Sequence, residues 1–129
     1  MIRQIINVDN YWRVIVYYNI DYDLFYYISK DLEAITTPVE EIIAIKQTLQ
    51  SRKAKAVTCS NIKYKTSVVG FNYHCSYYDY INSIVHEAEH IKQAMLKAYK
   101  VLDKGEPPAY TIGYIVMKML KVFHSFLKL

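Results

Sequence analysis

The sequence predicts an α+β fold, in which a small antiparallel sheet of about three strands packs on four helices. Segments rich in β-branched and aromatic residues are typical of strands, and longer segments repeat apolar residues at helical spacing. Glycine and proline are scarce, at three each among 129 residues, which argues against a long linker. A chain of this length suits one compact domain, so we expect a single domain over residues 1–129.

The first half of the chain is expected to hold one strand and two helices. Residues 12–19 read WRVIVYYN and predict a strand. Residues from about 21 to 35 and from 38 to about 50 predict helices, because their apolar residues recur on one face. Thr37 can cap the second helix, with Pro38 at its first position.

The second half is expected to hold a strand hairpin and two long helices. Residues 54–60 and 65–73 predict an antiparallel pair of strands joined by a short loop. Apolar residues at helical spacing then predict a helix from about 77 to 102, which ends before Gly105. The last helix is expected over about 106–127. From Ile112 onward it is apolar almost all round, so something must bury it.

The long third helix carries the motif His86-Glu87-Ala88-Glu89-His90, which fits the pattern H-E-x-x-H. Residues four apart lie on one helix face, so His86 and His90 can both bind one zinc ion. Glu87 lies beside such a metal and can act as general base on water that the metal activates. The alternative is two surface histidines that form ordinary pairs with Glu87 or Glu89.

A catalytic zinc site usually takes three protein ligands. We expect the third ligand to be Glu106, because it begins a helix that can pack antiparallel to the motif helix. Alternatively, Glu106 is only a carboxylate at the start of a helix, where the helix dipole stabilises it. Other candidates for the third ligand are Asp103, His124 and His74. Tyr110, one turn beyond Glu106, is a candidate donor to the oxyanion, or else one more core aromatic residue.

The order of hairpin, H-E-x-x-H helix, turn and helix beginning with glutamate resembles the gluzincin metallopeptidases, especially their small prokaryotic and phage-borne relatives of the ImmA/IrrE type. The resemblance covers roughly residues 55–119. It implies zinc ligands at His86 and His90, a general base at Glu87, and a third ligand at Glu106 within an E-x-x-A pattern. It also implies that the substrate backbone is bound by strand addition at residues 67–71. Tyr110 departs from the family, which has a further acidic residue after the third ligand.

These features predict a zinc-dependent metallopeptidase that hydrolyses peptide bonds of a protein substrate. The alternative is a catalytically silent, zincin-like interaction protein, or a structural protein of a phage or mobile element, that docks through its apolar C-terminal helix over 109–129. That helix would join another copy of the chain or a partner protein.

The sequence favours a cytoplasmic setting, in a bacterial or phage-infected cell, with a virion as the alternative. The N-terminus lacks the apolar core of a signal peptide, and no stretch is long and apolar enough to predict a membrane span. The two cysteines, Cys59 and Cys75, form no C-x-x-C pair and do not predict a disulfide scaffold.

The net charge of +4 is modest, and the densest basic cluster comprises Arg52, Lys53, Lys55, Lys63 and Lys65. Lysines on an exposed sheet edge protect it from unwanted pairing, and we favour this interpretation over nucleic-acid binding.

Overall fold

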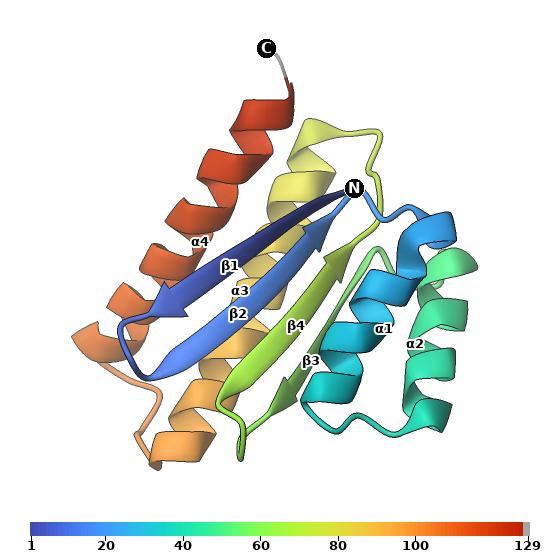
Figure 1. The fold of residues 1–129 in the computed structure, drawn as a ribbon. Coiled ribbons are helices and arrows are strands. Elements are labelled where there is room, and N and C mark those ends of the chain that lie inside the picture. The colour runs from blue at the N-terminus through green and yellow to red at the C-terminus, as the bar shows by residue number, and fades with distance from the viewer. Residues whose placement is uncertain (128–129) are drawn as a thin grey trace.

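The computed structural model describes residues 1–127, apart from the side chains of Glu106 and Leu127, and it confirms the α+β fold class. Four strands alternate in pairs with pairs of helices along the chain (Figure 1). The strands are β1 (Ile2–Val8), β2 (Trp12–Tyr18), β3 (Ala56–Asn61) and β4 (Thr66–Phe71). The helices are the short 3-10 helix η1 (Tyr22–Leu24), α1 (Phe25–Ala34), α2 (Val39–Gln50), α3 (Tyr77–Tyr99) and α4 (Glu106–Leu127).

The sheet has four strands in the order β1-β2-β4-β3 and is mixed, where we expected about three antiparallel strands. The pairs β1–β2 and β3–β4 are antiparallel, whereas β2 and β4 are parallel neighbours. The additional strand, β1, has a weak sequence signal because Arg3, Gln4 and Asn7 interrupt its apolar residues. As an edge strand it needs only one well-buried end, which Ile6 and Val8 provide.

The sheet separates two helical layers. Helices α1 and α2 cover one face, towards the β4–β3 side, and α3 and α4 cover the other face (Figure 1). The two hydrophobic cores follow from the alternation of β2, whose Val14, Val16 and Tyr18 face α3 and α4 while Ile15 and Tyr17 face α1 and α2.

Helix α4 is buried by its own chain. Ile115, Met119 and Phe123 are fully buried against α3 and the sheet. Its apolar composition is therefore largely explained by packing within the domain, and the exposed apolar side chains that remain include Tyr110 and Met117.

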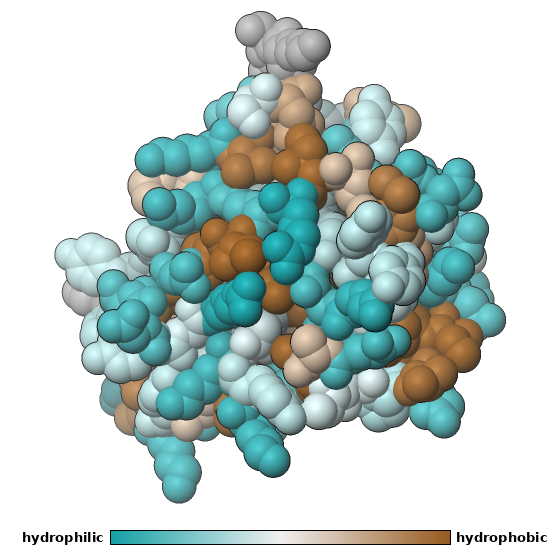
Figure 2. Space-filling view, in the orientation of Figure 1, coloured by the Kyte–Doolittle hydropathy of each residue, from teal (hydrophilic) through white to brown (hydrophobic). Residues whose placement is uncertain are grey.

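The outer surface over β1, β2, α1 and α2 is mixed in character. Brown hydrophobic groups stand in separate patches among teal and white ones (Figure 2). Within residues 1–127, no helix has both the length and the apolar character that a bilayer span requires.

Candidate metal centre

Helix α3 presents the H-E-x-x-H motif because its ends and its buried stripe are well defined. Ser76 caps its start by accepting a hydrogen bond from the backbone N–H of Asp79, and Lys100 ends it in the left-handed conformation. Ile84, Ala88 and Ile91 are fully buried on the face towards the sheet. The helical repeat then turns the two motif histidines away from the core.

His86 and His90 lie together on the exposed side of α3. Their Nε2 atoms are 3.1 Å apart, within hydrogen-bond distance, and their rings meet edge to face. Two nitrogens bound to one tetrahedral zinc ion at about 2.0–2.1 Å would be roughly 3.4 Å apart. The donor type and the separation of this pair therefore fit zinc with little rearrangement.

Glu87, between the two histidines in sequence, faces the sheet. Its side chain is buried, at 5% exposed, and Oε1 accepts a hydrogen bond from the Thr58 hydroxyl on β3, at 3.0 Å. A buried carboxylate needs such a donor to offset its lost hydration. Thr58 was not among the predicted site residues, although the alternation of Thr58 and Ser60 with Val57 and Cys59 marks a strand with one polar face.

A second polar contact lies one helical turn before Glu87. His74, in the segment after β4, is within 2.8 Å of the Ser83 hydroxyl through Nε2 and within 2.6 Å of the Asn72 carbonyl through Nδ1. Since a carbonyl only accepts, Nδ1 carries the proton and Nε2 accepts from Ser83. Burial, partly offset by the hydrogen bond to Asn72, lowers the pKa of His74 and favours this neutral form.

The motif opens into a small cavity at the start of β3. Its volume is about 260 Å³, and its lining includes Ser83, His86 and Glu87 from α3 together with Lys55 and Ala56. The cavity gives the Glu87 side of the motif a path to the outside.

Two acidic residues near the motif are engaged with other side chains. Glu89 and Asp103 both form ion pairs with Lys92, at 2.9 and 3.0 Å, and both accept hydrogen bonds from Gln93. Hydrogen bonds from Gln93 and Lys92 lower the pKa of Glu89, and those from Lys92 and Gln93 lower the pKa of Asp103. These contacts connect the end of α3 to the turn before α4, rather than to the histidines.

The other candidate ligands are dispersed. His124 contacts the Tyr77 hydroxyl at 3.1 Å, and His74 is bound to Ser83 as described above. Tyr110 is exposed and lies beside Val8 and Asp9, so the structure does not bring it together with the motif. The side chain of Glu106 lies outside the described residues. Among the side chains that are described, no three from histidine, cysteine, aspartate or glutamate gather into a metal site.

The expected site of strand addition differs from the structure. Residues 67–71 belong to β4, which is hydrogen-bonded to β2 on one side and to β3 on the other, so β4 has no open edge. The strand at this edge of the sheet is β3, which also supplies Thr58 to Glu87. The sequence did not reveal this because strand order depends on pairing between distant segments.

The structure defines an α+β protein with a pair of adjacent, exposed histidines on a helix that packs beside an edge strand. No protein-family model, curated protein or solved structure matches this chain.

Proposed function

We propose that this protein is a zinc-dependent metallopeptidase whose centre is the H-E-x-x-H motif on α3. One observation carries the proposal: the exposed His86 and His90 hold their Nε2 atoms 3.1 Å apart while the Glu87 carboxylate is held by Thr58 of the edge strand. The exposed histidine pair and the buried carboxylate meet at one cavity, whose lining includes both His86 and Glu87.

His86 and His90 would hold the zinc ion through their Nε2 atoms. The ion would supply Lewis acidity, which favours ionisation of water and polarises a carbonyl group. The Thr58 hydroxyl occupies Oε1 of Glu87, which leaves Oε2 to take a proton from water and later return it to the leaving amine. Thr58 is a positioning residue in this scheme, because it fixes the orientation of the carboxylate.

The substrate in this proposal is an extended segment of a protein. Such a segment can pair with the open edge of β3 by backbone hydrogen bonds. The inner face of β3 carries Thr58, so a peptide on this edge would pass close to Glu87.

Glu106 is proposed as the third ligand. This assignment rests on the resemblance of Glu106-Pro107-Pro108-Ala109 to the gluzincin pattern. Glu106→Ala is expected to lower zinc occupancy sharply; full occupancy in this variant would reject Glu106 as a ligand and leave the histidine pair untouched.

The peptidase activity is tested by Glu87→Gln. General-base catalysis contributes about 10²–10⁴-fold, so hydrolysis of an unfolded protein substrate should fall by that factor while zinc content stays unchanged. Glu89→Gln is the matched control, because Glu89 contacts Lys92 and Gln93 and should retain activity. Equal proteolysis by the wild type and Glu87→Gln would contradict the assignment of the general base.

A second candidate function is a catalytically silent interaction protein that docks through the helix over 109–129, on another copy or on a partner. Tyr110 and Met117, at 73% and 42% exposed, favour it, because they leave apolar surface on α4. Sedimentation of the wild type and of the Tyr110→Ser/Met117→Ser variant tests it. A dimeric wild type and a monomeric variant would support docking through this helix. A monomeric wild type would reject self-association.

We propose a bacterial or phage-infected cytoplasm as the setting. Cys59 and Cys75 are free thiols, which suits a reducing compartment.

A further inference from the structure

The parallel pairing of β2 and β4 brings both hairpin turns to one end of the sheet. Each of these strands is the second strand of its hairpin, so the turn before β2 and the turn before β4 lie side by side. The Arg13 backbone N–H donates to the Lys65 carbonyl at 3.0 Å and joins the two turns. This end of the sheet is opposite to the end that holds the motif cavity, because β3 starts at one and finishes at the other.

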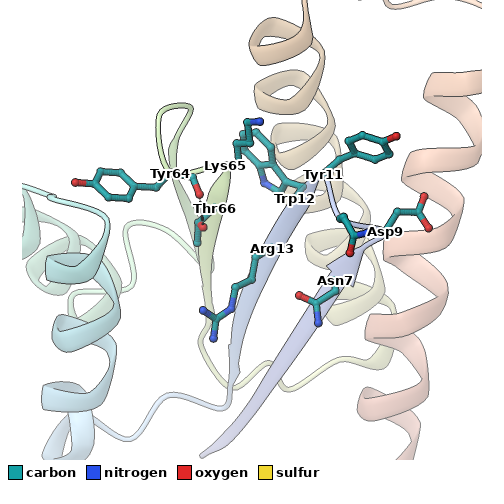
Figure 3. A pocket seen from close by; sticks show the side chains of 9 residues that line it. Asn7, Asp9, Tyr11, Trp12, Arg13, Tyr64, Lys65 and Thr66 are labelled. Atoms are coloured by element: carbon teal, nitrogen blue, oxygen red, sulfur yellow. Dashed lines mark hydrogen bonds between the residues drawn. The ribbon is translucent and has the colours of Figure 1, made fainter.

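A cavity of about 630 Å³ opens between the two turns. Its lining includes an aromatic and a basic side chain from each hairpin, namely Tyr11 and Arg13 from the first and Tyr64 and Lys65 from the second. Figure 3 shows Tyr64 and Tyr11 on opposite sides of the cavity with their rings pointing away from each other, Lys65 and Trp12 between them, and Arg13 and Asn7 below. Both tyrosines are exposed, at 60% for Tyr11 and 42% for Tyr64.

The wall formed by Tyr11 and Lys65 is held in place by α3. The Tyr99 hydroxyl donates to the Tyr11 carbonyl at 2.7 Å, and the Tyr99 ring meets the Tyr11 ring edge to face. Lys65 places its Nζ 5.2 Å from the centre of the same Tyr99 ring. These contacts order two side chains before any ligand arrives, which lowers the entropy lost on binding.

The charges in this cavity are available to a ligand. In the part of the chain that the structure describes, neither Arg13 nor Lys65 forms an ion pair with an acidic residue. Asp9 is the one acidic residue in the lining. The cavity therefore combines cations, the amide of Asn7 and exposed aromatic rings, which are the groups that bind phosphates and stacked bases.

We propose that this cavity binds single-stranded nucleic acid, with phosphates on Arg13 and Lys65 and bases stacked on Tyr11 and Tyr64. The site shares Lys65 with the basic cluster of the sequence but takes Arg13 from the other hairpin. The fold divides that cluster, because Arg52, Lys53 and Lys55 lie before β3 whereas Lys63 and Lys65 lie in the turn after it. The nucleic-acid site is independent of the proposed zinc site.

The test is fluorescence anisotropy of a labelled oligothymidylate at low salt, with an abasic strand of equal length as the comparison. We expect micromolar affinity for oligothymidylate and at least fivefold weaker binding of the abasic strand, because stacking requires bases. Equal affinity for the two strands, or no binding of either, would overturn the proposal. Competition by inorganic phosphate as effective as that by unlabelled oligothymidylate would also overturn it, as it would indicate a simple anion site.

Variants locate the site. Arg13→Gln should weaken binding several-fold and reduce the slope of log affinity against log salt by about 0.7, the value for one phosphate contact on a single strand. Lys53→Gln removes the same charge from the other end of β3 and should leave both quantities unchanged. An equal loss in Lys53→Gln would indicate general attraction to a cationic chain and overturn the assignment.

Two further variants test base stacking on Tyr64 and the repulsion of phosphates by Asp9, separately from the positive charge of Arg13. Tyr64→Leu keeps an apolar side chain but removes the ring, and it should weaken oligothymidylate binding about fivefold without affecting the abasic strand. Asp9→Asn should strengthen binding, because it removes the acidic group from the lining, and asparagine tolerates the positive φ of 51° at this position. Unchanged affinity in both variants would overturn the proposed contacts.

Discussion

Helices α3 and α4 lie on the same face of the sheet but bury different kinds of side chain. At its centre α4 buries Ile115, Met119 and Phe123, all fully inaccessible. Over a similar length α3 buries Ser83 and Glu87 among its apolar residues. Burial of polar groups contributes little net stability even when they are hydrogen-bonded. We therefore expect the apolar positions of α4 to contribute more to stability than the polar positions of α3. Of the buried polar groups of α3, Glu87 belongs to the proposed metal centre.

The largest expected effect on stability is in the apolar helix. Phe123→Ala should lower the free energy of unfolding by about 3–5 kcal/mol, because it removes a fully buried ring and leaves a cavity. Urea unfolding followed by circular dichroism measures the change. If Phe123→Ala loses less free energy of unfolding than a variant of the polar contacts on α3, then α3 and not α4 contributes more to stability.

A smaller effect is expected where α3 meets β3. Thr58→Val keeps the shape of the side chain but removes the donor to Glu87, so stability should fall by about 1–3 kcal/mol. Urea unfolding again provides the measurement, and proteolysis should fall as well, because Glu87 loses its orientation.

The double variant Thr58→Val/Glu87→Met sharpens this result. Replacement of both partners by apolar groups of similar size is often nearly neutral or stabilising. Recovery of stability with no recovery of proteolysis would show that the polar pair serves catalysis. A double variant as unstable as Thr58→Val alone would instead assign the pair a structural role.

The burial of His74 should make stability depend on pH. Because burial lowers the pKa of His74, the unfolded chain binds the proton more readily than the folded protein. The stabilisation is present above the ordinary histidine pKa of about 6.5 and is lost as the pH falls from there towards the lowered value. Lys55 and Arg52 disfavour the charged form, and Asp79 favours it.

The measurement is the urea midpoint across this pH range for the wild type and for His74→Gln. The variant should have a flatter profile below neutral pH. His124→Gln, which changes a histidine whose partner is the exposed Tyr77, is the control and should keep the wild-type profile. Identical profiles for His74→Gln and the wild type would show that His74 is not the group responsible for the pH dependence of stability.

The smallest effect is expected for the exposed motif histidines. In the absence of metal, His86→Asn/His90→Asn should change the free energy of unfolding by less than about 0.5 kcal/mol, as usual for surface positions. Added zinc should stabilise the wild type and leave the double variant unchanged. A large loss of stability without metal would mean that the pair has a structural role.

Local patterns in the sequence predicted more of the fold than of the site. Helical periodicity was enough to place the motif on α3 and to turn His86 and His90 away from its buried stripe. The parallel pairing of β2 with β4 and the contact of Thr58 with Glu87 join distant segments, and no local pattern encodes them. The sequence of α4 also did not reveal what covers its apolar sides, and we considered a partner. In the structure, packing on α3 and the sheet of the same chain covers most of them.

Metal analysis after dialysis tests the central claim most directly. We expect about one zinc ion per chain in the wild type and in the control His124→Asn. His86→Asn/His90→Asn should contain none. Zinc retained by the double variant, or absent from the wild type after loading, would contradict a metal centre on α3.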